Sequence, residues 1–454
     1  MRFYVENFGC RASQADGAAL EREFLTRGYQ RTATAVQADF VIVNTCTVTT
    51  AADTQARQWI RKLHRANPAC CILATGCYAQ RAPQELAALP GVAWVVGNSH
   101  KAEIPQLIEP ELVCFSSVPV RSGAVAATRE LSRTGPPVRI VTGNIFAQQN
   151  VMVAPVFGGE NYRTRPSLKI QDGCNQRCAY CVIPYVRGRS RSLPPEAVLE
   201  QIHRLVNIGY KEVVLTGVNL GSYGRDLKPA TSLRQLTECI LAETALPQLR
   251  FSSIEPGHLT PEFICLLASS ERIARHLHVP LQSGSDCILR RMRRGYCAED
   301  YAARLLAAHA ALPNAGLGAD VLVGFPGESE ADFRATYELI ERLPFTYLHV
   351  FSFSKRPGTP AAAMPDQIPV PVVKERSRAL RALGAEKQRC FRQQQLGRTL
   401  KVLTLARVDG HGRVAALSEN YIKVKVTAPL PPNQLLPVHV SGVTPEGLLA
   451  HPLN

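Results

Sequence analysis

The N-terminal part of the chain alternates short apolar runs with amphipathic stretches. Predicted strands cover residues 2–5, 38–43, 71–74 and 92–96. Predicted helices, with apolar side chains at helical spacing, cover residues 13–27, 50–66 and 83–89. Strands that alternate with helices favour a parallel sheet with helices on its faces. We therefore predict an N-terminal α/β domain over residues 1–114.

The alternation stops and then resumes. Residues 115–160 are rich in Ser, Gly and Pro and are interpreted as a linker with some local strand pairing. In residues 161–390 the predicted strands are 168–171, 212–215, 249–254, 276–281, 318–323 and 346–351. The helical patterns between them are 195–207, 232–243, 298–311 and 330–343. Six β/α units indicate an open, partial (β/α)6 barrel, whose chemistry sits at the carboxyl ends of the strands.

The tail has a different pattern. A basic helical stretch at residues 369–395 leads to Gly397, after which the apolar runs become short and are separated by turns. The predicted tail strands are 400–405, 413–416, 421–427 and 436–440. This pattern predicts a small β-barrel over residues 391–454. The fold class as a whole is α/β.

Composition narrows the class of protein. Hydrophobic residues make up 46% and charged residues 20% of the chain, and the apolar runs are far too short to span a bilayer. The first residues lack the apolar region of a secretory signal. We therefore expect no membrane association and a cytoplasmic location, where the 14 cysteines are thiols and not a disulfide framework.

The net charge of +15 is distributed over the whole chain. Residues 1–150 carry 15 basic and 11 acidic groups, residues 151–390 carry 30 and 23, and residues 391–454 carry 7 and 3. A polyanion that touches several domains is the functional interpretation, with nucleic acid the leading candidate. The alternative is a soluble enzyme that is simply basic.

Cys174, Cys178 and Cys181 form a C-x3-C-x2-C motif directly after the first predicted barrel strand. A structural zinc site takes four protein ligands, and no fourth thiol is near in the sequence. Three thiolates leave one position open, as a reactive iron–sulfur cluster requires. A zinc site or a structural cysteine cluster is the alternative.

Three further cysteines, Cys10, Cys46 and Cys77, each follow a predicted strand of the N-terminal domain. Adjacent parallel strands deliver the residues after them to one edge of a sheet. This placement predicts a second site with three thiolates. The alternative is that these are unrelated buried cysteines, since free Cys is a common small core residue.

Polar and small residues at the other barrel strand ends are candidates for binding a cofactor. The candidates are Tyr180, Gly217, Asn219, Ser253, Glu255, His278, Gln282 and Ser283. Arg187, Arg189 and Arg191 suit phosphate or carboxylate recognition, or form a solvated basic loop. The same two interpretations apply to Arg290, Arg291, Arg293 and Arg294, which flank Met292.

Together these residues resemble the methylthiotransferases of the radical S-adenosylmethionine (SAM) class, nearly end to end. Beside the two cysteine triads, the segments that carry the resemblance are residues 169–174, 180–185, 253–256, 276–285, 324–328 and 356–359. The tail resembles the TRAM domain, an RNA-binding module. One departure is visible, because the family usually has Asn three residues after the first ligand, where this chain has Ser13.

The resemblance implies two [4Fe–4S] clusters with SAM as cosubstrate. Cys174, Cys178 and Cys181 would hold the cluster that cleaves SAM, and Cys10, Cys46 and Cys77 an auxiliary cluster that carries the sulfur. Tyr180, Gly217, Ser253, Glu255 and Gln282 would line the SAM site. An electron donor such as flavodoxin or ferredoxin is implied.

Three substrates compete within the family: an N6-isopentenyladenosine in tRNA, an aspartate of a ribosomal protein, and N6-threonylcarbamoyladenosine at position 37 of tRNA. Residues 165–173 and 418–424 are most similar to the third group, which acts on C2 of a base in the anticodon loop. The isopentenyladenosine group is the alternative among enzymes. A non-catalytic iron–sulfur RNA-binding protein is the alternative outside them.

Overall fold

The computed structural model describes residues 1–116, 137–152 and 164–453, with the backbone alone for residues 111–116. The chain forms two compact units. The first comprises Met1–Ala154, Gly173–Asn175 and Val182–Arg189, and the second comprises Pro155–Asp172, Gln176–Cys181 and Ser190–Asn454. Most of the predicted linker, residues 115–160, lies outside the described residues. Within those residues, no helix combines the length and apolar character needed to cross a membrane.

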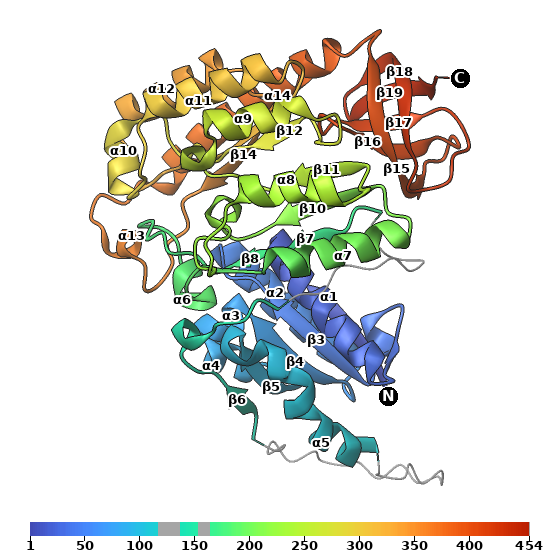
Figure 1. Ribbon diagram of the computed structural model, residues 1–454. Helices are drawn as coiled ribbons and strands as arrows, with labels where there is room; N and C mark the ends of the chain where they lie inside the picture. The colour runs from blue at the N-terminus through green and yellow to red at the C-terminus, as the bar shows by residue number, and fades with distance from the viewer. Residues whose placement is uncertain (117–136, 153–163, 454) are drawn as a thin grey trace. The chain divides into compact units, whose positions relative to one another are not determined.

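The first unit is built on a parallel sheet of six strands in the order β2-β1-β3-β4-β5-β6 (Figure 1). The strands are β1 (Arg2–Asn7), β2 (Gln30–Arg31), β3 (Phe40–Thr45), β4 (Cys71–Gly76), β5 (Val92–Gly97) and β6 (Arg139–Val141). Strand β3 is buried at every position, as expected for a parallel strand covered on both faces. Strand β6 pairs with β5, so the segment after the N-terminal domain does contribute local strand pairing.

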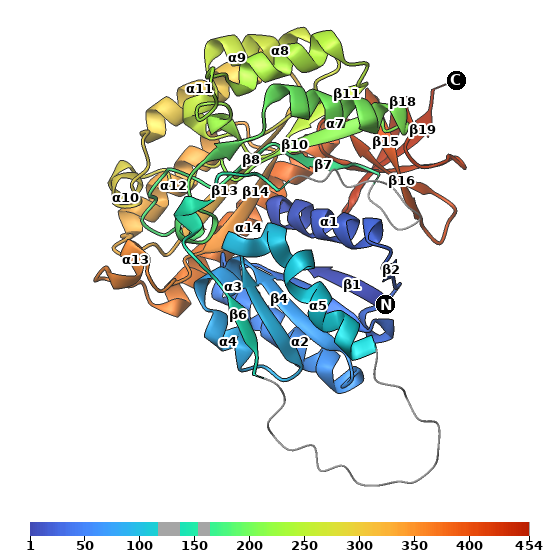
Figure 2. The ribbon, with the colours of Figure 1, turned by 60° about the horizontal axis from the view of Figure 1, so that its bottom comes forward.

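Helices cover both faces of this sheet (Figure 2). They are α1 (Arg11–Thr26) and α5 (Ile104–Ser116) on one face, and α2 (Thr50–Ala66), α3 (Cys77–Arg81) and α4 (Pro83–Ala87) on the other. The helix predicted at 83–89 is confirmed as α4, which begins at Pro83 and ends at Ala87. A short helix α3 precedes it, and Pro83, which has no backbone N–H to donate, begins a new helix as its first residue.

The core of the second unit confirms the predicted partial barrel. Its strands are β7 (Ser167–Lys169), β10 (Glu212–Thr216), β11 (Gln248–Phe251), β12 (His276–His278), β13 (Gly316–Val323) and β14 (Tyr347–Ser352). They form two parallel three-stranded sheets, which the bridges Leu249–Ile273 and Ser253–His278 connect. Its helices of nine or more residues are α7 (Pro195–Asn207), α8 (Leu233–Glu243), α9 (Pro261–Ser269), α11 (Ala298–Ala311), α12 (Glu330–Arg342) and α14 (Val370–Gln393).

The tail is a closed barrel in the order β15-β16-β17-β19-β18. The strands are β15 (Thr399–Val408), β16 (Val414–Ser418), β17 (Lys423–Val426), β18 (Leu435–Thr444) and β19 (Gly447–Pro452). The sequence did not predict β19, whose short apolar run lies between a glycine and a proline. This strand closes the barrel by pairing antiparallel with β18 and parallel with β17.

A buried arginine joins the tail barrel to the core. Arg250 of β11 is fully buried and donates hydrogen bonds to the carbonyl oxygens of Ser418 (3.2 Å) and Glu419 (3.0 Å). The next turn places Tyr421 at φ 70°, and its ring stacks on that of His276 with 4.2 Å between centroids. The tail barrel therefore packs against strands β11 and β12 of the core through both hydrogen bonds and ring stacking.

Candidate functional site

The first candidate site lies at one edge of the N-terminal sheet. Strands β1, β3 and β4 are neighbours, and Cys46 and Cys77 follow β3 and β4 directly, while Cys10 follows β1 after a short turn. Cys46 and Cys77 are nearly inaccessible, with 4% and 2% of their surface exposed, whereas Cys10 is exposed. The sheet therefore delivers three thiols to one edge, two of them inside the protein.

Two glycines allow the loops at this edge to approach closely. Gly9 and Gly76 each precede a cysteine and both have φ +101°, which side chains disfavour. A Cβ on Gly9 would lie 2.5 Å from Cys46 Cβ, and one on Gly76 would lie 2.3 Å from the carbonyl oxygen of Thr45. A glycine is therefore required before Cys10 and before Cys77 for the three thiols to lie at one edge of the sheet.

The three thiols influence one another. Burial raises the pKa of Cys46 to about 12, and the neighbouring Cys77 and Cys10 add to this rise. The side-chain amide of Asn98 donates to Cys77 Sγ at 3.5 Å, and Ser13 Oγ lies 3.7 Å from Cys10 Sγ. The buried Cys46 thiol therefore keeps its proton until a cation replaces it, which is how metal centres bind thiolates.

The spacing of these thiols argues against a single zinc ion. Around tetrahedral zinc, with bonds of about 2.3 Å, sulfur atoms lie only about 3.8 Å apart. In the part of the chain that the structure describes, the one group of three His, Cys, Asp or Glu ligand atoms mutually within 4.8 Å is His278, Asp320 and His349. The sulfurs of Cys10, Cys46 and Cys77 do not all lie within 4.8 Å of one another, a spacing that an iron–sulfur cluster, larger than one zinc ion, can bridge.

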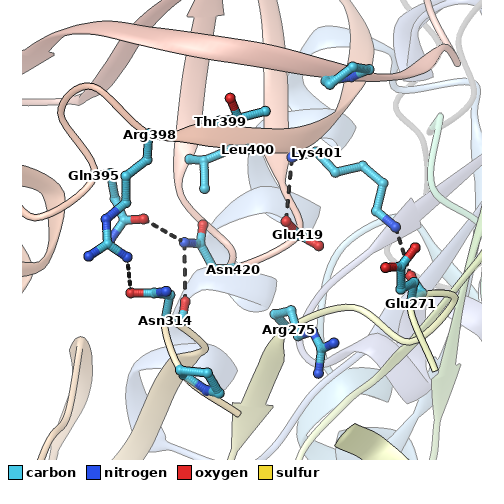
Figure 3. A pocket seen from close by; sticks show the side chains of 12 residues that line it. Glu271, Arg275, Asn314, Gln395, Arg398, Thr399, Leu400, Lys401, Glu419 and Asn420 are labelled. Atoms are coloured by element: carbon cyan, nitrogen blue, oxygen red, sulfur yellow. Dashed lines mark hydrogen bonds between the residues drawn. The ribbon is translucent and has the colours of Figure 1, made fainter. Parts of the chain in front are cut away.

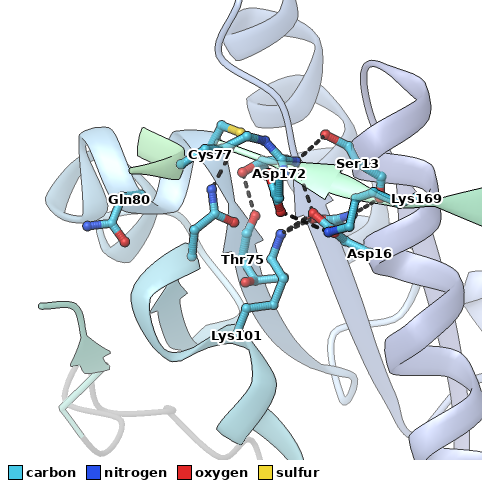
Figure 4. A network of polar contacts seen from close by, with 12 residues as sticks. Ser13, Asp16, Thr75, Cys77, Gln80, Lys101, Lys169 and Asp172 are labelled. Atoms are coloured by element: carbon cyan, nitrogen blue, oxygen red, sulfur yellow. Dashed lines mark hydrogen bonds and ion pairs between the residues drawn. The ribbon is translucent and has the colours of Figure 1, made fainter. Parts of the chain in front are cut away.

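A buried charge network lies beside this edge (Figure 4). Asp16 Oδ2 accepts from Lys101 Nζ at 3.0 Å and from Arg187 Nη2 at 2.9 Å, and all three side chains are at most 5% exposed. Arg187 also donates to Ser13 Oγ at 3.2 Å. Two buried cations therefore contact one buried carboxylate close to the thiols of the first unit. Because Arg187 lies in a basic stretch of the sequence, its burial could not be predicted from the sequence.

The second cysteine motif follows β7. The Cys174 backbone N–H donates to the carbonyl of Gly188 at 3.1 Å. Cys178 and Cys181 are joined by a backbone hydrogen bond of 3.0 Å, and Ala179 between them donates to the carbonyl of Met292 at 2.9 Å. Cys178 is buried, while Cys174 and Cys181 are half-buried. Backbone hydrogen bonds thus hold this loop in place.

Arg294 links this loop to a predicted SAM residue. Its guanidinium is ion-paired with Glu255 and donates to Cys178 Sγ at 3.4 Å. Burial raises the pKa of Glu255, and Arg294 opposes that rise. The ring of Tyr296 lies 5.1 Å from the guanidinium. Sequence reasoning left Arg294 among four arginines of a helix end, because nothing in the spacing distinguished the buried one.

The other predicted SAM residues lie at strand ends of the core. Tyr180 is the exception: it is half-buried in the loop between Cys178 and Cys181, and burial raises its pKa. Gly217 lies against Gln171, whose Oε1 would be 2.8 Å from an added Cβ. Ser253 bridges to His278. Gln282 has φ 66° and donates its backbone N–H to the carbonyl of Asp320 at 2.8 Å.

A cavity of about 410 Å³ lies where the tail barrel meets the core (Figure 3). Three of its lining side chains are basic: Arg275, Arg398 and Lys401. Lys401 Nζ donates to the carbonyl of Glu271 at 2.7 Å, and its backbone N–H donates to Glu419 Oε1 at 3.4 Å. The cavity is polar and offers cationic groups on both the core and the barrel.

A partial β/α barrel with three cysteines after its first strand defines a radical SAM protein. The chain matches the Radical SAM superfamily over residues 168–340 and an uncharacterised protein family, UPF0004, over residues 2–97. The fold resembles a solved radical SAM methyltransferase, TsrM from Kitasatospora setae, with a TM-score of 0.52 and 18% identity over 79% of this chain and 76% of that one.

Two relatives narrow the family. One is the threonylcarbamoyladenosine tRNA methylthiotransferase MtaB of Aquifex aeolicus, 39% identical over 94% of this chain and 96% of the relative. The other is the tRNA-2-methylthio-N(6)-dimethylallyladenosine synthase of Desulfitobacterium hafniense, 34% identical over 87% and 84%. The chain belongs to the radical SAM methylthiotransferase family. As a radical SAM enzyme it uses an iron–sulfur cluster and SAM.

Proposed function

We propose that this enzyme methylthiolates C2 of N6-threonylcarbamoyladenosine at position 37 of tRNA, as an MtaB-type methylthiotransferase. The observation that carries this proposal is the 39% identity, along almost the whole of both chains, to the MtaB enzyme of Aquifex aeolicus. The two cysteine triads support it, because insertion of sulfur requires both a radical and a sulfur carrier.

Each triad is assigned one cluster in this proposal. Cys174, Cys178 and Cys181 hold the [4Fe–4S] cluster at which SAM is cleaved, and Cys10, Cys46 and Cys77 hold an auxiliary [4Fe–4S] cluster. When bound, the two clusters supply the electron for SAM cleavage and the sulfur for transfer. The three auxiliary sulfurs do not all lie within 4.8 Å of one another, as they would around one zinc ion, and this supports the second assignment.

The protein's own residues hold and order these groups. The guanidinium of Arg294 donates a hydrogen bond to Cys178 Sγ and keeps Glu255 in place at the mouth of the core. Glu255, with Tyr180, Gly217, Ser253 and Gln282, is proposed to orient SAM. Lys101 and Arg187 compensate the negative charge of the thiolates in the first unit.

The nucleic acid is proposed to contact the tail barrel. Lys401 and Arg398 lie on the barrel side of the cavity and Arg275 on the core side, and such groups attract phosphates. The base at position 37 lies in a single-stranded loop and can be extruded into the core. Flavodoxin or ferredoxin is the proposed electron donor, and the cytoplasm the proposed location.

Nucleoside mass spectrometry of tRNA from cells that lack this gene tests the substrate. The expected result is loss of the 2-methylthio group from threonylcarbamoyladenosine, with the unmodified precursor retained. Loss of the methylthio group from N6-dimethylallyladenosine, with the threonylcarbamoyl product unchanged, would overturn the substrate assignment.

Iron analysis of anaerobically reconstituted protein tests the two clusters. Replacing Cys10, Cys46 and Cys77 together by Ala should remove about four irons per chain and abolish methylthiolation while SAM cleavage continues. The matched control is Cys265→Ala, which removes an exposed cysteine of α9. It should leave the iron content and the methylthiolation activity unchanged. Unchanged iron in the triple variant contradicts the auxiliary cluster.

A further inference from the structure

One face of β12, β13 and β14 carries a row of rings and charged groups that the proposed mechanism has not used. Register pairs Gly318 with Tyr347, Asp320 with His349 and Leu322 with Phe351. Residues that pair across neighbouring strands point to the same face. The opposite face of β14 is covered by α14, since a Cβ on Gly384 would lie 3.2 Å from Leu348 Cβ. The row therefore faces away from the covering helix.

The row is continuous. The Tyr347 hydroxyl lies 2.8 Å from His276 Nε2 and 3.0 Å from His278 Nδ1. Asp320 Oδ1 then lies 3.0 Å from His278 Nε2 and 3.4 Å from His349 Nδ1. The ring of Phe351 meets that of His349 edge-on at 6.4 Å. At one end the row reaches Tyr421 of the tail barrel, whose ring stacks on His276.

The other end of the row leads to the proposed SAM site. Burial raises the pKa of Glu255, Arg294 opposes the rise, and Asp320 adds to it, so the two carboxylates lie within electrostatic reach. The backbone carbonyl of Asp320 accepts from Leu281 and Gln282. Asp320 is thus positioned between the strand end that holds Glu255 and the face of β14.

Two members of the row are exposed although they belong to a core strand. The His349 side chain is 54% accessible and Phe351 is 44% accessible. Large exposed rings on a barrel strand are unusual, because the large apolar side chains of such strands are usually buried in the core. Exposed aromatic and His rings are the groups on which proteins stack unpaired bases.

We infer that this row recognises the extruded base: Phe351 and His349 stack on the purine, and Asp320 and His349 bind its polar N6 substituent. This inference rests on the proposed function and names the residues that select the substrate. The occupant is an adenine whose N6 group carries hydrogen-bond donors and a carboxylate, as threonylcarbamoyl does.

The chemistry of the row explains the selection. Asp320 accepts from a hydroxyl or a urea N–H, and an imidazole N–H donates to a carboxylate. An apolar dimethylallyl group offers neither, and it would displace water from Asp320 and His349 without replacing the lost hydrogen bonds. Sites built to bond a polar group reject an analogue that lacks it far more strongly than apolar sites discriminate by size.

The test uses the full-length, anaerobically reconstituted enzyme with two tRNAs, one carrying N6-threonylcarbamoyladenosine and one N6-dimethylallyladenosine at position 37. His349→Leu should lower kcat/KM for the first tRNA by about 10- to 100-fold and leave or raise the value for the second. The matched control is His309→Leu, which changes an exposed histidine of α11 and should alter neither value. SAM cleavage without tRNA should be the same in all three proteins.

Stacking is tested separately. Phe351→Ala should raise KM for both tRNAs by about tenfold with little change in kcat, and Phe351→Tyr should restore KM. Leu306→Ala removes a similarly exposed apolar side chain, 49% accessible, from α11 and is the control. An unchanged KM in Phe351→Ala overturns the stacking role.

The outcomes separate this inference from the proposed function. If the wild-type enzyme modifies the threonylcarbamoyl tRNA and His349→Leu retains its preference, the inference is wrong and the proposed function stands. If the wild-type enzyme modifies neither tRNA, both are wrong. A divalent metal retained at one per chain by the wild type and lost in His349→Leu would assign the row to metal binding and also overturn the inference.

Discussion

Lys101 Nζ lies 3.0 Å from Asp16 Oδ2, and both side chains are almost completely withdrawn from solvent. The same oxygen accepts from Arg187 at 2.9 Å. One carboxylate therefore holds two buried cations next to the cysteines of the first unit. Asn44, whose Oδ1 accepts from Lys101 at 3.2 Å, adds a neutral partner.

Removing the shared carboxylate of Asp16 should lower the free energy of unfolding more than removing Lys101 or Arg187 would. Asp16→Asn removes the carboxylate that both buried cations contact, and we expect a loss of about 3–5 kcal/mol in the free energy of unfolding. Glu23→Gln on the same helix changes an exposed pair and should cost under about 0.5 kcal/mol. Anaerobic denaturant unfolding measures both, and equal effects would contradict the role of Asp16.

The ion pair between Glu212 and Arg250 should make stability depend on acid pH. Burial works against the charged carboxylate, but Arg250 and Arg165 outweigh it and lower the pKa of Glu212 from 4.5 to about 2. Because the folded-state pKa is the lower one, the stabilisation is complete above pH 4.5 and is lost as the pH falls toward 2.

The variant Glu212→Gln isolates this contribution. At pH 7 it should be destabilised by about 3–5 kcal/mol, since the buried guanidinium of Arg250 and the half-buried one of Arg165 lose their carboxylate. The difference from wild type should shrink as the pH falls below 4.5, the ordinary pKa of the group. Unfolding midpoints of both proteins between pH 7 and pH 3 measure it, and a difference that is constant with pH would refute the assignment.

A methyl group at Gly9 should remove the proposed auxiliary cluster. Gly9→Ala places Cβ 2.5 Å from Cys46 Cβ at φ +101°, so the loop that carries Cys10 must move. We expect about four irons fewer per chain. Gly28→Ala has a comparable φ of +84° but meets nothing within 4 Å, so it should cost about 1 kcal/mol in stability and keep its iron. Iron analysis and anaerobic absorption spectra distinguish the two variants.

Arg294→Met should impair SAM cleavage. The substitution leaves Glu255 buried without its cation, and burial then favours the neutral carboxyl group. Cys178 also loses its hydrogen bond from the guanidinium. We expect a fall of at least about tenfold in the rate of 5′-deoxyadenosine formation. Arg290→Met, an exposed arginine of the same segment, should retain the rate, and equal rates in both variants would contradict the role of Arg294.

The sequence predicted the elements that depend on periodicity and the residues that depend on spacing. The parallel sheet of the first unit and the partial barrel followed from apolar runs that alternate with helical patterns. Cys10, Cys46 and Cys77 could be placed at one edge because each follows a strand. Strand β19 escaped prediction because Gly447 and Pro452 bound a run of only four residues.

Residues defined by burial and by cross-strand contacts could not be predicted. Arg294 and Arg290 look alike in the sequence, and only the fold shows that one is enclosed against Glu255. Asp320 and His349 are 29 positions apart, and their pairing depends on the register of β13 and β14. Neither residue carries a local motif, so the base-recognition row is visible only in three dimensions.

The hydrogen bonds from Arg250 to Ser418 and Glu419 have a consequence for how this enzyme can be divided or recombined. A truncation before the tail barrel would leave a buried guanidinium without its carbonyl partners and uncover the ring of His276. The tail barrel is therefore not an interchangeable accessory. A chimera that exchanges tails between relatives should retain activity only if it preserves the turn at residues 418–421 together with Arg250.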